Sequence, residues 1–289
     1  MAYNEQVSTL ALRAEYVDSA VKGIAERLYK FKQSLNIQTT SAWKNTIWQE
    51  NPNPLVNAGG LSIKVPRGAQ PPQGKVKFNR KTVEIDKYMF EDIILWEDIL
   101  TDEISVQSRT LYRIAEKVTK DVDDTIWTDL TTQDATIQLV TIAAGKHWSG
   151  SSAAIIDDIM NARTLIASSN YDVSNCTLYL NPRDYRSIVR WVTDKGAQFN
   201  ALSEEAARNG RVPGLSGVTF IQSNSVAASQ ALMVVPKICA TWYEAVSFRT
   251  TTIEDPYISL KVRAVEEGKT NITDPQAIVW IKNTRGDDT

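Results

Sequence analysis

Residues 65–80 read VPRGAQPPQGKVKFNR, with three Pro, two Gly, four basic residues and no acid. The stretch has too few apolar residues to build a core. Short alternating pieces at 61–65 and 75–80 flank the P-P-Q-G turn and predict a two-stranded hairpin within residues 57–83. Because an isolated hairpin is only marginally stable in water, something outside it must hold it.

The sign of the charge reverses directly after this hairpin. Residues 57–83 carry six basic residues and no acid, whereas residues 84–103 carry eight acids and one Lys. Two interpretations are open. Either these segments are two solvated faces, or the basic arm of one copy lies on the acidic base of the next copy. The second is a head-to-tail contact, which can close into rings. On the second interpretation the basic arm is Lys64, Arg67, Lys75, Lys77, Arg80 and Lys81, and the acidic base is Glu84, Asp86, Glu91, Asp92, Glu97 and Asp98.

Two helices are predicted on either side of this region. Apolar residues from Val17 to Leu35 recur every three or four positions and form one stripe, which packs on its own domain or on a neighbouring copy. Residues 36–56 show no period, contain N-P-N-P and are predicted to be irregular. From Asp102 the helical period holds over roughly 27 residues, a strut on the order of 40 Å long.

The second half of the chain alternates between element types. Strands are predicted at 136–142, 176–180, 218–222 and 231–235, in an α/β module without a regular repeat. Ser151 or Ser152 is the expected N-cap of one helix, Asn181-Pro182 begins another, and a short helix covers 203–208. Further strands follow at 242–248, at 258–264, where apolar and polar residues alternate, and at 277–281.

Bulk properties fit a folded, water-exposed protein. The 289 residues are 43% hydrophobic and 23% charged, with a net charge of −2. No signal peptide and no run of roughly 20 apolar residues is present, so no membrane contact is expected. Cys176 and Cys239 lie far apart and are expected to be reduced thiols of the core.

The motifs of enzymes and metal sites are missing or incomplete. His147 is the only histidine, which excludes a zinc site with two His and disfavours a Ser-His or Cys-His pair. Gly268-Lys269-Thr270 lacks the earlier Gly of a phosphate loop, and Asp121, Asp123 and Asp124 lie within a helical period. No cofactor, no metal and no catalytic residue is predicted, although sequence alone leaves a carboxylate-dependent hydrolase open.

The order of the elements resembles the major capsid proteins of tailed bacteriophages, the Hong Kong 97-type coat fold. Three stretches carry the resemblance: NPRDYRSI (181–188), GRVPGLSGVTFIQSNSV (210–226), in which Val218-Thr219 replaces a Pro-Val pair, and the final strands from ATWYEAVSFR to AIVWIKN. The resemblance implies an α+β fold whose extended hairpin, the E-loop, reaches across a neighbouring subunit. It divides the chain into an N-terminal arm (1–56), the E-loop (57–83), a peripheral domain with a spine helix (84–135), an α/β axial domain (136–240) and return strands of the peripheral domain with a tail (241–289).

The function implied by this resemblance is structural. Copies would form pentamers and hexamers of an icosahedral shell around double-stranded DNA, held without sequence specificity, in a virion assembled in the host cytoplasm. Partners would include portal and scaffolding proteins and possibly decoration proteins. The axial contact is expected in the polar stretch 194–213, at Asp194, Lys195, Glu204, Glu205, Arg208 and Arg211. The alternatives are a cellular nanocompartment shell of the same fold and, from a different class, the soluble hydrolase.

Overall fold

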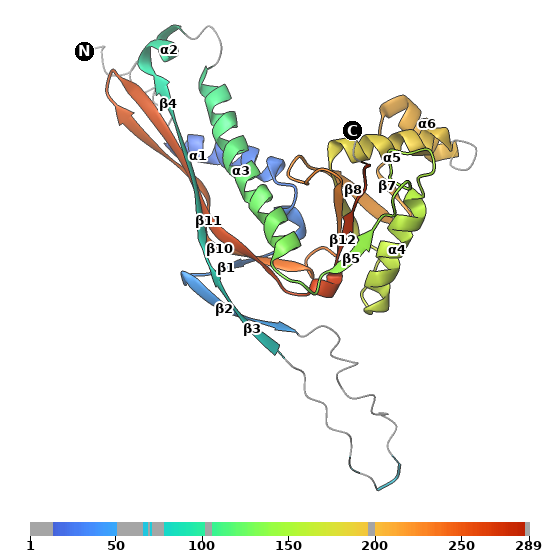
Figure 1. Ribbon diagram of the computed structural model, residues 1–289. Coiled ribbons are helices and arrows are strands. Elements are labelled where there is room, and N and C mark those ends of the chain that lie inside the picture. The colour runs from blue at the N-terminus through green and yellow to red at the C-terminus, as the bar shows by residue number, and fades with distance from the viewer. Residues whose placement is uncertain are drawn as a thin grey trace.

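The computed structural model describes residues 14–50, 66–68, 70, 78–101, 106–195 and 200–286. Two sheets flank a long helix, and a separate two-stranded ladder projects from the body (Figure 1). The helix α3 (Val106–Thr132) has 27 residues, so the predicted strut is confirmed. It lies along the first sheet, and the second sheet stands beyond its C-terminal end (Figure 1).

The first sheet has four strands in the order β1-β10-β11-β4. The strands are β1 (Asn36–Thr39), β4 (Asp86–Leu95), β10 (Ala240–Asp255) and β11 (Ser259–Ile272). Helix α1 (Ala14–Leu28) packs on α3 and β10, and α3 packs on β4 and β11. The apolar stripe of the N-terminal segment is therefore buried within its own subunit, which confirms the first of the two predicted alternatives.

The second sheet has six strands in the order β5-β12-β9-β6-β8-β7. They are β5 (Gln138–Thr141), β6 (Thr177–Leu180), β7 (Gly214–Leu215), β8 (Val218–Gln222), β9 (Gln230–Val234) and β12 (Ile278–Lys282). The last strand, expected with the return strands of the peripheral domain, pairs here with β5 and β9. Ile278, Val279 and Ile281 of this strand are buried, which suits an interior strand of a sheet covered on both faces.

Three helices flank the second sheet: α4 (Ile155–Ser168), α5 (Pro182–Asp194) and α6 (Asn200–Asn209). The Asn181 side chain accepts the Arg183 N–H at 3.1 Å, so the predicted cap before Pro182 is confirmed. The predicted Ser cap of α4 is wrong. Ala154 occupies the N-cap, and Ser152 Oγ instead donates to the Gly145 carbonyl at 2.7 Å, inside the preceding loop.

The prediction of irregular chain over 36–56 is wrong at 36–39 and 44–50, and its last part, 51–56, lies outside the described residues. Strand β1 pairs in parallel with β10, and β2 (Lys44–Glu50) pairs antiparallel with β3 (Phe78–Glu84). The described ladder is therefore formed by residues 44–50 and 78–84. The predicted strand at 61–65 lies outside the described residues, and the one at 75–80 coincides with β3 only from Phe78 onward.

The remaining short elements connect these parts. They are η1 (Lys32–Ser34) after α1, α2 (Trp96–Thr101) after β4, and η2 (Pro275–Ala277) before β12. One buried apolar cluster runs from α1 through α3 into both faces of the second sheet. The described residues therefore form one packed body, and the β2–β3 ladder stands out from it.

Candidate functional site

The β2–β3 ladder turns an aromatic and a basic side chain away from the body. Trp48 is 62% exposed and faces Arg80, its direct cross-strand partner, which is also exposed. Paired residues of an antiparallel ladder share a face and lie about 5 Å apart. Trp and Arg are the residue types most enriched among residues that dominate binding at protein interfaces. The run NTIWQ has no alternation of apolar and polar residues, so its signal for a strand was limited to the β-branched and aromatic residues Thr46, Ile47 and Trp48.

The opposite face of the ladder is attached to the body. Ile47 and Val83 are buried, and Gln49 and Lys81 both donate to Asp134 Oδ2, at 2.8 and 2.7 Å. Burial of the Asp134 carboxyl opposes its ionisation, but the bonds from Lys81 and its other donors outweigh burial and hold its pKa well below the usual range. The root of the hairpin is thus fixed by a carboxylate that stays charged.

The predicted basic arm is only partly described. Lys64, Lys75 and Lys77 lie outside the described residues. Arg67 and Arg80 are exposed, whereas Lys81 turns inward to Asp134. Among the described members, Arg67 and Arg80 are therefore the cations placed to meet another surface.

Three acids of the predicted acidic base pair with cations of their own chain. Asp86 Oδ2 lies 2.8 Å from Lys269 Nζ, and Glu91 Oε2 lies 2.5 Å from Arg263 Nη2. Glu84 pairs with Lys44 across the ladder. The first two pairs form because β4 runs antiparallel to β11 and sets Glu91 directly opposite Arg263. Asp92 is half-buried, and Glu97 and Asp98 are exposed on α2.

The outer face of β4 is apolar as well as charged. Met89, Ile93 and Leu95 are each about half exposed and alternate with side chains that face α3. Glu91 lies among them and carries its ion pair with Arg263. Clusters of exposed apolar side chains rimmed by charge are typical of interaction surfaces. The acids of this strand were predicted from the sequence, whereas the exposed apolar stripe was not.

The six predicted axial residues all lie on the surface at the end of the molecule formed by α5 and α6 (Figure 1). Asp194 and Lys195 lie at the C-terminal end of α5, Glu204, Glu205 and Arg208 on α6, and Arg211 in the loop that follows. Three are acids and three are bases. A surface with equal numbers of both signs can pair head-to-tail with a copy of itself.

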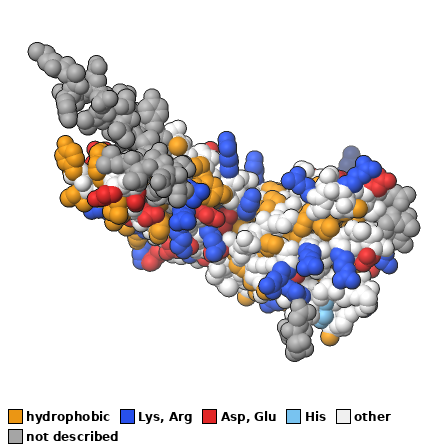
Figure 2. Space-filling model, turned by 90° about the horizontal axis from the view of Figure 1, so that it is seen from above, with side chains coloured by type: hydrophobic (Ala, Val, Ile, Leu, Met, Phe, Trp, Pro, Cys, Tyr) orange, Lys and Arg blue, Asp and Glu red, His pale blue; other side chains and the backbone are white. Residues whose placement is uncertain are grey.

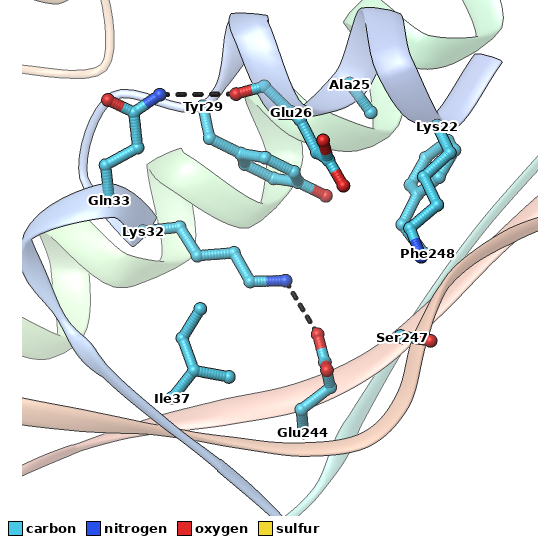
Figure 3. Close-up of a pocket in the computed structure, with 10 residues that line it drawn as sticks. All are labelled: Lys22, Ala25, Glu26, Tyr29, Lys32, Gln33, Ile37, Glu244, Ser247 and Phe248. Carbon is cyan, nitrogen blue, oxygen red and sulfur yellow. Dashed lines mark hydrogen bonds and ion pairs between the residues drawn. The ribbon is translucent and has the colours of Figure 1, made fainter. Parts of the chain in front are cut away.

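A small pocket separates α1 from the first sheet (Figure 3). Its volume is about 290 Å³, and Lys32 reaches across its wall. Lys32 Nζ lies 2.8 Å from Glu244 Oε1 and 2.6 Å from Glu266 Oε1. Tyr29 donates its hydroxyl hydrogen to Glu266, whose side chain is fully buried.

The charges of this pocket serve packing rather than chemistry. Burial disfavours the charged form of Lys32, but Glu266 and Glu244 outweigh burial and raise its pKa above the usual value. Burial and then Glu266 raise the pKa of Tyr29 above its usual range. A lysine held protonated between two carboxylates is no nucleophile. Lys32 and Glu266 are more than 200 positions apart in the chain, so no local sequence pattern predicts that they meet.

Other reactive side chains are accounted for in the same way. Cys176 and Cys239 are buried and unbridged, as expected. His147 Nδ1 lies 2.8 Å from the Asn283 carbonyl oxygen, in a loop beside the second sheet. Within the described residues no group of three or more His, Cys, Asp or Glu is arranged to hold a metal ion. No helix among those residues is long and apolar enough to cross a membrane.

Comparison with known proteins finds one matching family model and several solved structures with a similar fold. The family model described as "Phage capsid protein" matches residues 80–281. The capsid of the cyanophage P-SCSP1u has a TM-score of 0.66 at 12% identity, over 88% of each chain. The mature capsid of bacteriophage PhiM1 gives 0.62 at 14% identity, over 88% of this chain and 86% of that one. A virus-like particle from Pyrococcus furiosus gives 0.65 at 12% identity, over 94% and 100%. No curated protein sequence matches the chain.

Proposed function

The chain belongs to the phage capsid protein family, and we propose that its copies close a shell by laying the hairpin of one subunit on the body of the next. As a member of this family it is a structural shell protein of the virion and not an enzyme. The observation that carries the proposal is the outward face of the β2–β3 ladder. Trp48 and Arg80 are exposed there, and no part of the chain that the structure describes packs over them.

The receiving surface in this proposal is the outer face of β4 on the neighbouring subunit. Met89, Ile93 and Leu95 offer apolar area for Trp48, and Glu91 lies among them on the same face of the strand. Because Asp86 and Glu91 already have intrachain partners, apolar burial contributes more to this contact than charge does. Fully burying one large apolar side chain contributes about 1.5–3 kcal/mol.

The wider assembly follows from the family and the described surfaces. The four-stranded sheet with α3 acts as the peripheral domain, and the six-stranded sheet with α4, α5 and α6 acts as the axial domain. Axial domains meet around five-fold and six-fold axes through the six exposed residues of the 194–213 stretch. The resulting icosahedral shell encloses double-stranded DNA without sequence specificity. Portal, scaffolding and decoration proteins join it, and assembly takes place in the host cytoplasm.

The test is a double variant of the outward face, Trp48→Ala with Arg80→Glu. It removes the aromatic anchor and reverses one charge while leaving the Lys81–Asp134 root intact. The concentration of subunits needed for shell formation should rise at least tenfold, since about 1.4 kcal/mol per contact corresponds to a factor of ten. Light scattering and negative-stain electron microscopy measure this.

A matched control changes the same residue types elsewhere. Tyr112 and Arg113 are neighbouring exposed residues on α3, and Tyr112→Ala with Arg113→Glu should assemble close to the parent concentration. Circular dichroism of both variants checks that the subunit is folded. Parent-like assembly of a folded Trp48/Arg80 variant would show that this face of the ladder is not an intersubunit contact.

A further inference from the structure

A wide cleft with a basic lining lies at the end of the molecule that holds α5. Its volume is about 820 Å³, and it opens between the loop at 148–151, α5 and the segment after β12. In the view from above, Lys and Arg side chains gather over this end (Figure 2). The charged side chains that line it are Arg183, Arg186, Arg190, Lys195 and Arg285, with Asp194 as the one acid among them.

The spacing of three of these arginines places them in one row. Arg183, Arg186 and Arg190 follow one another at three and four positions along α5, so they share a face of the helix. All three are exposed. Seven helical residues span about 10 Å, which matches about three nucleotides at 3.4 Å per step of one strand.

The walls between which these side chains stand are fixed. Trp148 is almost fully buried, and its indole N–H donates to Asp158 Oδ2 at 2.9 Å. The indole N–H of Trp191 donates to the Ala153 carbonyl at 3.1 Å. The loop is also tied to the last strand, because the Trp148 N–H donates to the Thr284 carbonyl at 2.8 Å. Both indole N–H groups are therefore used within the fold, and the three arginines of α5 stand exposed beside walls that are held in place.

The positive charge is poorly compensated within the cleft. Asp194 Oδ2 lies 3.8 Å from Arg190 Nε, and both side chains are mostly exposed, so their pairing is weak. Among the residues that line the cleft, Arg183, Arg186, Arg190 and Lys195 thus share Asp194 as their one carboxylate, while Arg285 also interacts with the buried Asp184. Arginine remains charged at physiological pH, and its planar fork matches phosphate oxygens in a bidentate way.

We propose that this cleft binds the phosphate backbone of nucleic acid, and that in the shell it is a contact between the capsid wall and the packaged duplex. The inference rests on the proposed function for the identity of the ligand, but not for the binding itself. Carboxylates of a second copy are the competing occupant. Carboxylates of a second copy fit less well. The predicted axial contact supplies three acids, Glu204, Glu205 and Asp194, and Asp194 already lies on the rim of its own subunit's cleft.

The experiment measures binding of a fluorescein-labelled DNA duplex of about 20 base pairs to unassembled subunits, by anisotropy over a range of salt. The test variant is Arg186→Glu with Arg190→Glu. Its affinity for the duplex should fall at least tenfold at low salt. The slope of log K against log salt should become shallower by about two, one for each phosphate contact that is lost. The matched control, Arg113→Glu with Lys120→Glu on α3, changes net charge equally and should stay within about threefold of the parent.

The outcomes separate the cleft from bulk charge and from a protein partner. Parent-like binding by the Arg186/Arg190 variant, or an equal loss in both variants, overturns the proposal. So does failure of shell closure in that variant with rescue by Glu204→Arg and Glu205→Arg, because the cleft then holds a second copy. Since binding is read on unassembled subunits, failure of the hairpin contact appears only in the shell assay and leaves this result unchanged.

Discussion

Asp123, on the buried side of α3, joins the long helix to the N-terminal segment. Its Oδ2 accepts the Lys30 N–H at 2.7 Å and its Oδ1 accepts the Phe31 N–H at 3.3 Å. The carboxyl is thus the acceptor for the chain where it turns from α1 into η1. Burial raises the pKa of Asp123 to about 7, although these N–H groups act in the opposite direction.

This carboxyl predicts a pH dependence of subunit stability. The pKa of this carboxyl is about 3.9 in the unfolded chain and about 7 in the folded chain. Its contribution to the stability of the fold is therefore fully present below about pH 4 and is lost as the pH rises to 7. The full difference is about 4 kcal/mol for a shift of about three units. Asp123→Asn should therefore reduce the slope of the free energy of unfolding against pH between about pH 4 and 7. The variant lacks the one carboxyl that holds its proton in the folded chain and releases it in the unfolded chain.

Urea unfolding of unassembled subunits at about pH 4.5, 6 and 8 measures this slope. Asp124→Asn, one position away and only half-buried, should keep the parent slope. If the Asp123 variant also keeps it, the carboxyl does not carry the proton assigned to it.

At the scale of elements, the pairing of β10 with β11 depends on one glycine. Gly268 lies opposite Glu244 on β10 and Asp86 on β4, beneath the fully buried ring of Trp242. A Cβ atom at this position would lie 2.3 Å from Trp242 Cζ2 and 2.5 Å from Cε2. The Gly-Lys-Thr triplet that resembles part of a phosphate loop is thus a strand whose glycine makes room for an indole.

Gly268→Ala should destabilise the subunit by about 1–3 kcal/mol, because the core must move to admit the methyl group. Gly23→Ala is the matched control, since a Cβ there would meet no atom within 4 Å. Alanine in that helix should be neutral or stabilise by up to about 1 kcal/mol. Thermal unfolding of both variants decides the point, and an unchanged midpoint for Gly268→Ala would contradict the packing described here.

At the scale of the whole molecule, the structure separates two surfaces. The four-stranded sheet with β4 lies on one side of α3, and the separate β2–β3 ladder projects from that side, whereas α5 and α6 flank the six-stranded sheet on the other side (Figure 1). A subunit with contacts at both ends can join neighbours around an axis at one end and across subunits at the other. The balanced charges of α6 and its following loop suit a head-to-tail contact around an axis.

A charge swap on α6 tests the axial contact. Glu204→Lys with Glu205→Lys should prevent rings from closing, because like charges then face one another across each contact. Adding Arg208→Glu and Arg211→Glu to the same chain should restore rings at least partly, since the signs are again complementary. Electron microscopy of the particles and circular dichroism of the subunits give the result. Rings that form equally well in the first variant would place α6 away from the axis.

The sequence by itself determined the elements whose signal is local. The period of three to four residues predicts α3, Asn181-Pro182 predicts the start of α5, and the charge reversal after Val83 predicts two segments of opposite sign. The tertiary structure alone decided which distant residues meet. It placed β1 and β2 in residues expected to be irregular, gave Glu91 the partner Arg263, and brought Arg285 to the arginines of α5. These contacts join residues from about 30 to about 200 positions apart. They depend on strand register and chain reversal, which neither periodicity nor local propensity determines.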